Sequence, residues 1–168
     1  MARRVFLHIG LPKTGTTFLQ TTMWENRPGL SRQGFLYPGR NRMEHYRASQ
    51  EVREASAKAL GKHAGTWARL VRDLAAWEGN GLVSHEFFSM ATPAQAQAAV
   101  AALAPAEVQV VVTVRSYVLQ FPAVWQEALK MNSELGFDAF MEEAFADRLK
   151  GAWGWASRVS PSSRRSRR

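Results

Sequence analysis

The stretch that decides the fold is VFLHI at residues 5–9, followed at once by GLPKTGTT at residues 10–17. The first part is short, mostly apolar and rich in residues that favour strands, which is typical of a parallel strand covered on both faces. A helix is expected after the second glycine, because four of the residues that follow would share one face of a helix: Phe18, Leu19, Thr22 and Met23. Pro28 stands shortly beyond that helix. The predicted order is strand, glycine-containing loop, helix.

The loop has the chemistry of a phosphate site. Backbone N–H groups at the start of a helix, together with the positive end of the helix dipole, form a cradle for a phosphate. Glycine lets the backbone approach the anion, a lysine adds a mobile positive charge, and threonine hydroxyls add donors. A glycine turn with a solvated lysine is the alternative. We expect the phosphate contacts to come from these residues: Lys13, Thr14, Gly15, Thr16 and Thr17.

Strand and helix patterns alternate along the middle of the chain. The pattern between residues 42 and 60 is weakly helical, and a clear helical stripe follows it, formed by Trp67, Leu70, Val71 and Leu74. Strands are expected at residues 82–84 and 108–114, and the second has the strongest strand pattern in the chain. Between these strands, Thr92 and Gln95 form a capping box around Pro93, so a helix is expected there that stops near Pro105.

Two more helical patterns follow residue 115. The first carries Val124, Trp125, Ala128 and Leu129, and Pro122 marks either its start or a kink. The second carries Phe137, Phe140, Met141, Ala144 and Phe145. The whole order predicts an α/β fold, a three-layer P-loop-like domain with a parallel β-sheet of three recognisable strands flanked by helices. We expect this domain to occupy residues 1–150, incompletely, and an irregular basic tail to occupy residues 151–168.

Composition sets outer limits on function. The 168 residues are 46% hydrophobic and 21% charged, as in globular proteins, and no cysteine is present, which excludes disulfides and thiolate chemistry and fits a cytoplasmic location. Five arginines lie in the last eleven residues, and without them the net charge falls from +8 to +3. We therefore expect a disordered, solvated tail and no specific nucleic-acid partner. No apolar run approaches the ~18 residues that a membrane span needs.

A single basic residue, Arg115, stands where the strand at 108–114 ends. The carboxyl ends of parallel strands form the edge at which α/β sheets bind ligands, and a guanidinium suits bidentate recognition of a phosphate. Alone, an arginine after a strand is more often a surface charge. Its occurrence beside the loop motif predicts a second phosphate contact.

The segment Ser84-His85-Glu86 follows the strand at 82–84 and offers two candidate bases. Adjacent side chains at a strand end usually point in different directions, so we expect only one of His85 and Glu86 to reach a substrate, and we favour Glu86. The other reading is that one of them caps the next helix. His8, inside the first strand, is either a buried hydrogen-bonded histidine or a cofactor contact. No cluster of His, Asp and Glu has metal-ligand spacing, so no metal is expected.

The sequence PKTGTT after VFLHIG closely resembles the 5'-phosphosulfate-binding loop of sulfotransferases that use 3'-phosphoadenosine 5'-phosphosulfate (PAPS). The strand that ends in Arg115 is similar to the family's 3'-phosphate-binding segment. The family often has a serine eight residues after this arginine, where this chain has Ala123, so the second 3'-phosphate contact comes from elsewhere or the affinity is reduced.

The resemblance implies transfer of a sulfuryl group from PAPS to a hydroxyl or amine of a small-molecule, sugar or lipid acceptor. It implies that Glu86 or His85 is the catalytic base and that Lys13 neutralises the departing phosphate, without a metal. Family members are usually longer, and their later portion helps to hold the adenine. No glycine-rich equivalent follows Lys150, so a C-terminally truncated family member is expected.

Two other readings compete with this one. A kinase or another P-loop NTPase needs a lysine directly after the second loop glycine and an Asp at the end of a neighbouring strand. This chain has Thr16, Ser84 and Arg115 at those positions, which disfavours a kinase. A non-catalytic or truncated remnant that binds a nucleotide is the second alternative.

Overall fold

A parallel β-sheet forms the centre of the fold. The computed structural model describes residues 2–54, 57–146 and 148–149, and the chain divides into two compact units, Met1–Val114 and Arg115–Arg168. The predicted boundary at residue 150 falls where the described residues end. The sheet of the first unit consists of β1 (Arg4–His8), β2 (Phe35–Leu36), β3 (Asn80–Ser84) and β4 (Glu107–Val111), in the spatial order β2-β3-β1-β4 with all neighbours parallel.

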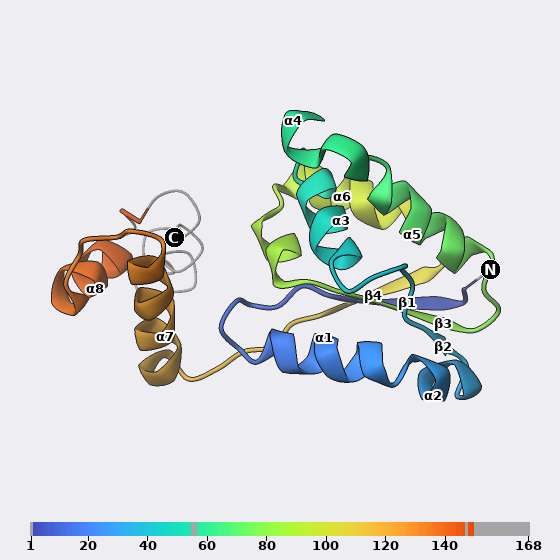
Figure 1. Cartoon of the computed structure of the whole chain (residues 1–168), viewed down its shortest axis with the longest axis horizontal. Coiled ribbons are helices and arrows are strands. Elements are labelled where there is room, and N and C mark those ends of the chain that lie inside the picture. Colours follow the sequence, from blue (N-terminus) through green and yellow to red (C-terminus); the bar gives the residue numbers. More distant parts are fainter. Residues whose placement is uncertain (1, 55–56, 147, 150–168) are drawn as a thin grey trace, which may run out of the picture. The chain divides into compact units, whose positions relative to one another are not determined.

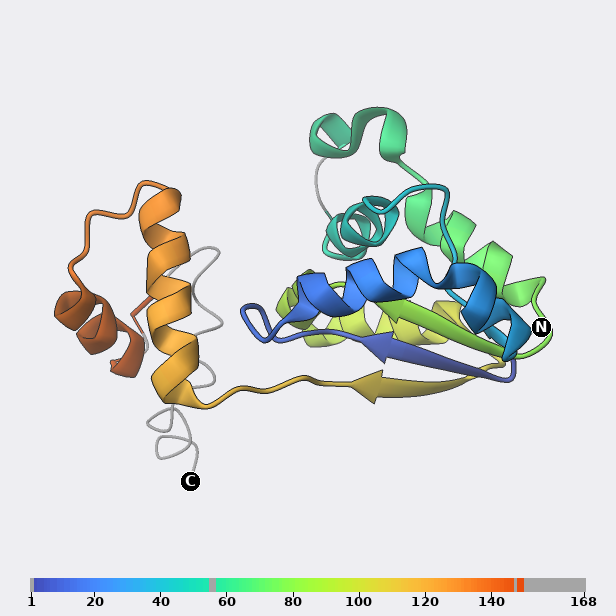
Figure 2. The ribbon, with the colours of Figure 1, turned by 60° about the horizontal axis from the view of Figure 1, so that its bottom comes forward.

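The register of the strands brings their carboxyl ends to one edge of the sheet. His8, the last residue of β1, pairs with Ser84 of β3 on one side and with Val111 of β4 on the other. Figure 2 shows β1 and β4 as arrows that point the same way, toward the loop that joins β1 to α1. The loop at residues 10–17 and the Ser-His-Glu segment therefore begin side by side.

Helices cover both faces of the sheet, which gives the predicted three-layer α/β architecture (Figure 1). One face carries α1 (Thr16–Glu25) and α2 (Arg27–Arg32), and the other carries α3 (Glu44–Val52), α5 (Thr66–Ala75) and α6 (Pro93–Ala102). Three short elements connect them: α4 (Ala57–Leu60) and the 3-10 helices η1 (Gly61–His63) and η2 (Glu86–Met90).

The main core lies between the sheet and the α3, α5 and α6 layer. Val5, Leu7 and Val83 point from the strands into this core, where they meet Leu70 and Leu74 of α5. Gly81 in β3 allows the closest approach, because a Cβ at that position would lie 2.3 Å from a methyl carbon of Leu74. The predicted helical stripe is therefore the buried face of α5.

The structure confirms most predicted elements and corrects several details. The capping box is present, with Thr92 N–H donating to Gln95 at 3.0 Å and Gln95 N–H donating to the Thr92 hydroxyl at 3.3 Å. The sheet has a fourth strand, β2, that the sequence did not predict. Pro28 stands shortly beyond α1 as predicted, and it is the second residue of a further short helix, α2.

Two predicted apolar faces are more exposed than expected. Phe18, which the sequence places on the shared apolar face of the first helix, is 74% exposed. The strand expected at 108–114 ends at Val111 and lies at the edge of the sheet, where Val110 is exposed. Val112 and Val114, which follow the strand, are exposed as well.

The second unit contains α7 (Tyr117–Lys130) and α8 (Phe137–Phe145), the two helices expected from the apolar patterns there. Pro122 lies inside α7, so that helix begins at Tyr117 and not at the proline. The predicted basic tail lies outside the described residues. Among the residues that are described, no helix is long and apolar enough to cross a membrane.

Candidate functional site

The loop between β1 and α1 is strongly curled. Gly10, Lys13 and Gly15 all adopt left-handed backbone conformations, with φ angles of 88°, 64° and 89°. Gly15 is the N-cap of α1, and its carbonyl accepts hydrogen bonds from the N–H groups of Phe18 and Leu19. The loop thus ends at the first turn of a helix, where N–H groups lack partners within the helix and attract anions.

A chain of hydrogen bonds holds the loop to the sheet. Thr14 donates its hydroxyl proton to the carbonyl of Leu11 at 2.5 Å and lies 2.7 Å from the hydroxyl of Thr113. The Thr113 backbone N–H also donates to Gly10 at 2.6 Å, and its carbonyl accepts from Leu11 at 2.9 Å. The hydroxyl of Thr14 therefore shapes the loop, and the backbone N–H of Thr14 is the group left to serve its predicted phosphate contact.

His8 belongs to the same chain. Its Nδ1 lies 2.7 Å from the hydroxyl of Ser84 and its Nε2 lies 3.1 Å from the hydroxyl of Thr113. Because the Thr14 hydroxyl already donates to Leu11, it must accept the proton of the Thr113 hydroxyl. The Thr113 hydroxyl then accepts from His8, so Nε2 of His8 is the nitrogen that carries the proton. Burial lowers the pKa of His8, against the opposing influence of Glu86, so the ring is neutral. With both nitrogens engaged, the geometry favours the buried, hydrogen-bonded role for His8.

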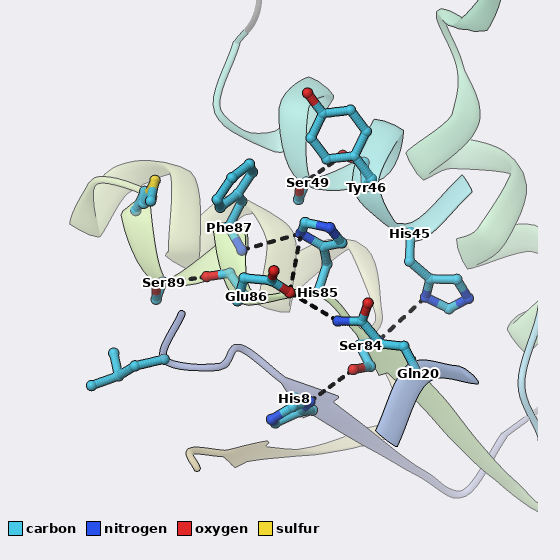
Figure 3. Close-up of polar contacts among 12 residues, drawn as sticks. His8, Gln20, His45, Tyr46, Ser49, Ser84, His85, Glu86, Phe87 and Ser89 are labelled. Carbon is cyan, nitrogen blue, oxygen red and sulfur yellow. Dashed lines mark hydrogen bonds and ion pairs between the residues drawn. The ribbon is translucent and has the colours of Figure 1, made fainter. Parts of the chain in front are cut away.

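Glu86 lies against the loop and the first turns of α1. Its carboxylate accepts a hydrogen bond from the Gln20 amide at 2.9 Å (Figure 3). It accepts another from the hydroxyl of Thr16. The backbone of Gly10 also packs against Glu86, because a Cβ added to Gly10 would lie 2.6 Å from Cβ of Glu86. Two of the predicted groups of site residues, the loop and the Ser-His-Glu segment, are thus brought together.

Glu86 is ionised at neutral pH. Burial acts to raise its pKa, but the neighbouring His85 and the hydrogen bonds donated by Gln20 and Thr16 lower it below the ordinary value. The carboxylate is only partly covered, with 19% of the side chain exposed. It is therefore both charged and reachable.

His85 has a different environment from Glu86. Its Nδ1 accepts the backbone N–H of Phe87 at 3.2 Å, which makes His85 the N-cap of η2. Burial lowers the pKa of His85, against the influence of Glu86, so the neutral ring carries its proton on Nε2. The His85 ring packs against the rings of Tyr46 and Phe87, at centroid distances of 5.2 and 5.1 Å. The capping role left open by the sequence thus falls to His85.

A cavity of about 280 Å³ opens beside these groups. Thr17 and Gln20 of α1 line it together with His85 and Glu86. The remaining wall is largely aromatic, with Arg42 and Met43 added: Trp24, Tyr37, Tyr46 and Phe87. The end of the loop at residues 10–17 and the candidate base therefore share one concave surface, which is the usual setting of a ligand site.

His45 is one of the residues of this region that sequence reasoning missed, together with Gln20 and Arg42. It is 1% exposed, accepts the Ser84 N–H on Nδ1 at 3.2 Å and donates from Nε2 to the Pro38 carbonyl at 2.9 Å. Its ring stacks on Tyr37 at 4.3 Å, and burial lowers its pKa to about 4. It thereby fixes the end of β3 to the wall of the cavity. No sequence signal marked it, since it lies in a weak helical pattern.

The other predicted contacts are distributed as follows. Lys13 is partly exposed at the tip of the loop. Arg115 is exposed and is the first residue of the second unit, so it is not among the residues that the first unit brings together. Ala123 lies within α7 of that second unit. In the described part of the chain, no group of three or more His, Cys, Asp or Glu residues is placed to hold a metal ion.

Comparison of the chain with models of protein families, with curated proteins and with solved structures gives no match.

Proposed function

We propose that this chain binds PAPS through the loop at residues 10–17 and transfers its sulfuryl group to a hydroxyl or amine acceptor. The observation that carries the proposal is the position of Glu86. An ionised carboxylate is held by Thr16 and Gln20, both on the helix that follows the loop, and it lines the cavity beside that helix. A phosphate cradle and a base are the two parts that sulfuryl transfer needs.

In the proposed reaction, the acceptor oxygen or nitrogen forms a bond to the sulfur of PAPS, and the bond between that sulfur and the bridging phosphate oxygen breaks. Its electron pair remains on the phosphate oxygen, which leaves as part of adenosine 3',5'-bisphosphate. Glu86 takes the proton of the acceptor, and Lys13 stabilises the charge that grows on the departing phosphate. Glu86 is favoured over His85 because Nδ1 of His85 already accepts a hydrogen bond and Nε2 carries a proton.

The same geometry disfavours a kinase. A P-loop NTPase uses a loop Ser or Thr hydroxyl and a strand-end Asp to hold magnesium. Here the hydroxyl of Thr16 donates to Glu86, and the strand-end residue Ser84 is bonded to His8. The strand end thus offers a serine hydroxyl where a P-loop NTPase has the Asp carboxylate that holds magnesium.

Calorimetric titration with adenosine 3',5'-bisphosphate tests donor binding. We expect binding by the full chain, weakened by Lys13→Ala through loss of a charge-assisted contact worth roughly 1.5–3 kcal/mol. Lys58→Ala, which removes an exposed lysine of α4, is the matched control and should leave the affinity unchanged.

Two outcomes would contradict the proposal. Equal or tighter binding of ATP with magnesium would favour the kinase. Binding of the bisphosphate without transfer of label from ³⁵S-PAPS to any of a panel of phenol, sugar, lipid and amine acceptors would identify a nucleotide-binding protein that lacks the transferase reaction.

A further inference from the structure

The cavity beside Glu86 has walls that suit a flat ring. Trp24 and Tyr37 lie edge to face with centroids 6.5 Å apart, and Tyr46 and Phe87 lie 5.8 Å apart. All four rings line the cavity. Aromatic surfaces gain more from an aromatic partner than from an aliphatic one of the same area.

The charges around this cavity are mainly positive. Arg42 lines it directly and donates a hydrogen bond to the hydroxyl of Thr21. Arg27 lies over the Trp24 ring at 4.3 Å, and Arg53 lies over the Phe87 ring at 5.3 Å. Within the described part of the lining, Glu86 is the one acidic side chain. An anionic group on a ligand would therefore be attracted to the Arg42 side and repelled from the Glu86 side.

The size of the cavity limits the ligand. About 280 Å³ is just below the usual range for drug-sized ligands, so a single substituted ring fits better than a fused system or an acyl chain.

We propose that the acceptor taken by this cavity is a single hydroxylated aromatic ring that carries one anionic substituent. Its ring lies among Trp24, Tyr46 and Phe87, its hydroxyl faces Glu86, and its anionic group faces Arg42. The role of this ring as the acceptor rests on the function proposed above, whereas its binding does not depend on sulfuryl transfer.

Four matched probes test this by calorimetry on the full chain without nucleotide. We expect 4-hydroxybenzoate to bind roughly ten-fold more tightly, or better, than 4-hydroxybenzamide, which is neutral, and than tyramine, which is cationic. It should also bind more tightly than 4-hydroxycyclohexanecarboxylate, which keeps the charge and loses the aromatic ring. If the amide, tyramine or the saturated acid binds as tightly as 4-hydroxybenzoate, the proposal is wrong.

Variants assign the binding to this cavity. Arg42→Ala should remove the preference for 4-hydroxybenzoate over the amide, whereas Arg72→Ala, on the exposed face of α5, should keep it. Trp24→Ala should weaken the binding of 4-hydroxybenzoate and of 4-hydroxybenzamide, and Phe18→Ala, which removes a 74% exposed ring of the same helix, should weaken neither. Circular dichroism spectra that match the parent show that each variant is folded. Equal effects of Arg42→Ala and Arg72→Ala would place the binding elsewhere.

Failure of this proposal and failure of the proposed function give different results. If 4-hydroxybenzoate binds with the expected ranking but receives no label from ³⁵S-PAPS, the ring site stands and the transferase does not. If label passes to sugars or aliphatic alcohols and 4-hydroxybenzoate neither binds nor reacts, the transferase stands and this acceptor class is wrong.

Discussion

At the residue scale, His85 and Glu86 are adjacent in sequence but their hydrogen bonds give them different roles. Glu86→Gln should lower turnover with labelled PAPS by ~10²–10⁴, because an amide cannot take the acceptor proton. Nucleotide affinity should change little, since the carboxylate is proposed to act on the acceptor. Glu25→Gln is the control, because it removes an exposed carboxylate at the end of α1. This variant should have the turnover of the parent protein.

His85→Ala, measured at saturating donor, is the comparison that tests this assignment. It removes the acceptor of the Phe87 N–H and two ring contacts, so its main effect should be on stability. If His85→Ala loses turnover and Glu86→Gln does not, the base is His85. Unchanged turnover in both would make the segment structural.

The sequence allowed the loop and Glu86 to be predicted because their signals are local. Gly10 and Gly15 signal their left-handed backbone conformations by residue type, and His85 and Glu86 directly follow a strand pattern. His45 could not be predicted in this way. Its partners are backbone groups of Pro38 and Ser84, the second of them 39 residues away, and backbone groups leave no mark in a sequence.

At the scale of elements, the loop at Gly10 packs closely against the start of η2. Gly10→Ala should destabilise the protein, because its Cβ would lie 2.6 Å from Cβ of Glu86 and alanine is strained at a φ of 88°. The strain costs about 1–2 kcal/mol and the overlap about 1–3 kcal/mol more. The measurement is the free energy of unfolding in urea.

Gly15→Ala provides the matched control for that prediction. Gly15 has nearly the same φ, 89°, but nothing lies within 4 Å of the position its Cβ would take. It should therefore show the strain alone, and the difference between the two variants measures the overlap. Equal losses would mean that the loop can move away from η2 without cost.

Elements with their own strong pattern were predicted and short ones were not. The helix at Thr66–Ala75 was evident from its apolar stripe, and the helix at Pro93–Ala102 from its capping box. The strand β2 has two residues, too few for any alternation to be recognised. The exposure of Phe18 could not be predicted either, because a periodic pattern shows which residues share a face but not what covers that face.

At the scale of the whole molecule, stability should fall on mild acidification. His45 has a folded pKa of about 4 against 6.5 when unfolded. The unfolded chain therefore binds the proton first, and stability that is fully present above pH 6.5 is lost as the pH falls toward 4. The loss attributable to His45 at pH 5 should be roughly 2 kcal/mol. Burial shifts His8 and His85 in the same direction.

Urea unfolding at pH 7.5, 6.5, 5.5 and 5.0 measures this dependence. His45→Gln replaces the titrating ring with an amide, so its free energy of unfolding should fall less over the same range, even if it is lower at pH 7.5. A slope as steep as that of the parent protein would show that His45 does not carry the acid sensitivity.

The hydrogen bonds that assemble the site join residues far apart along the chain, and this has a consequence for biosynthesis. Gln20 and its partner Glu86 are 66 residues apart, His8 and Ser84 are 76 apart, and Thr14 and Thr113 are 99 apart. At a synthesis rate of about 5–20 residues per second, the loop is made seconds before the groups that hold it. The nascent loop cannot keep its shape until β4 has left the ribosome and paired with β1. Because a ligand that binds only the assembled form stabilises it, the nucleotide proposed to bind this loop should also favour completion of the sheet.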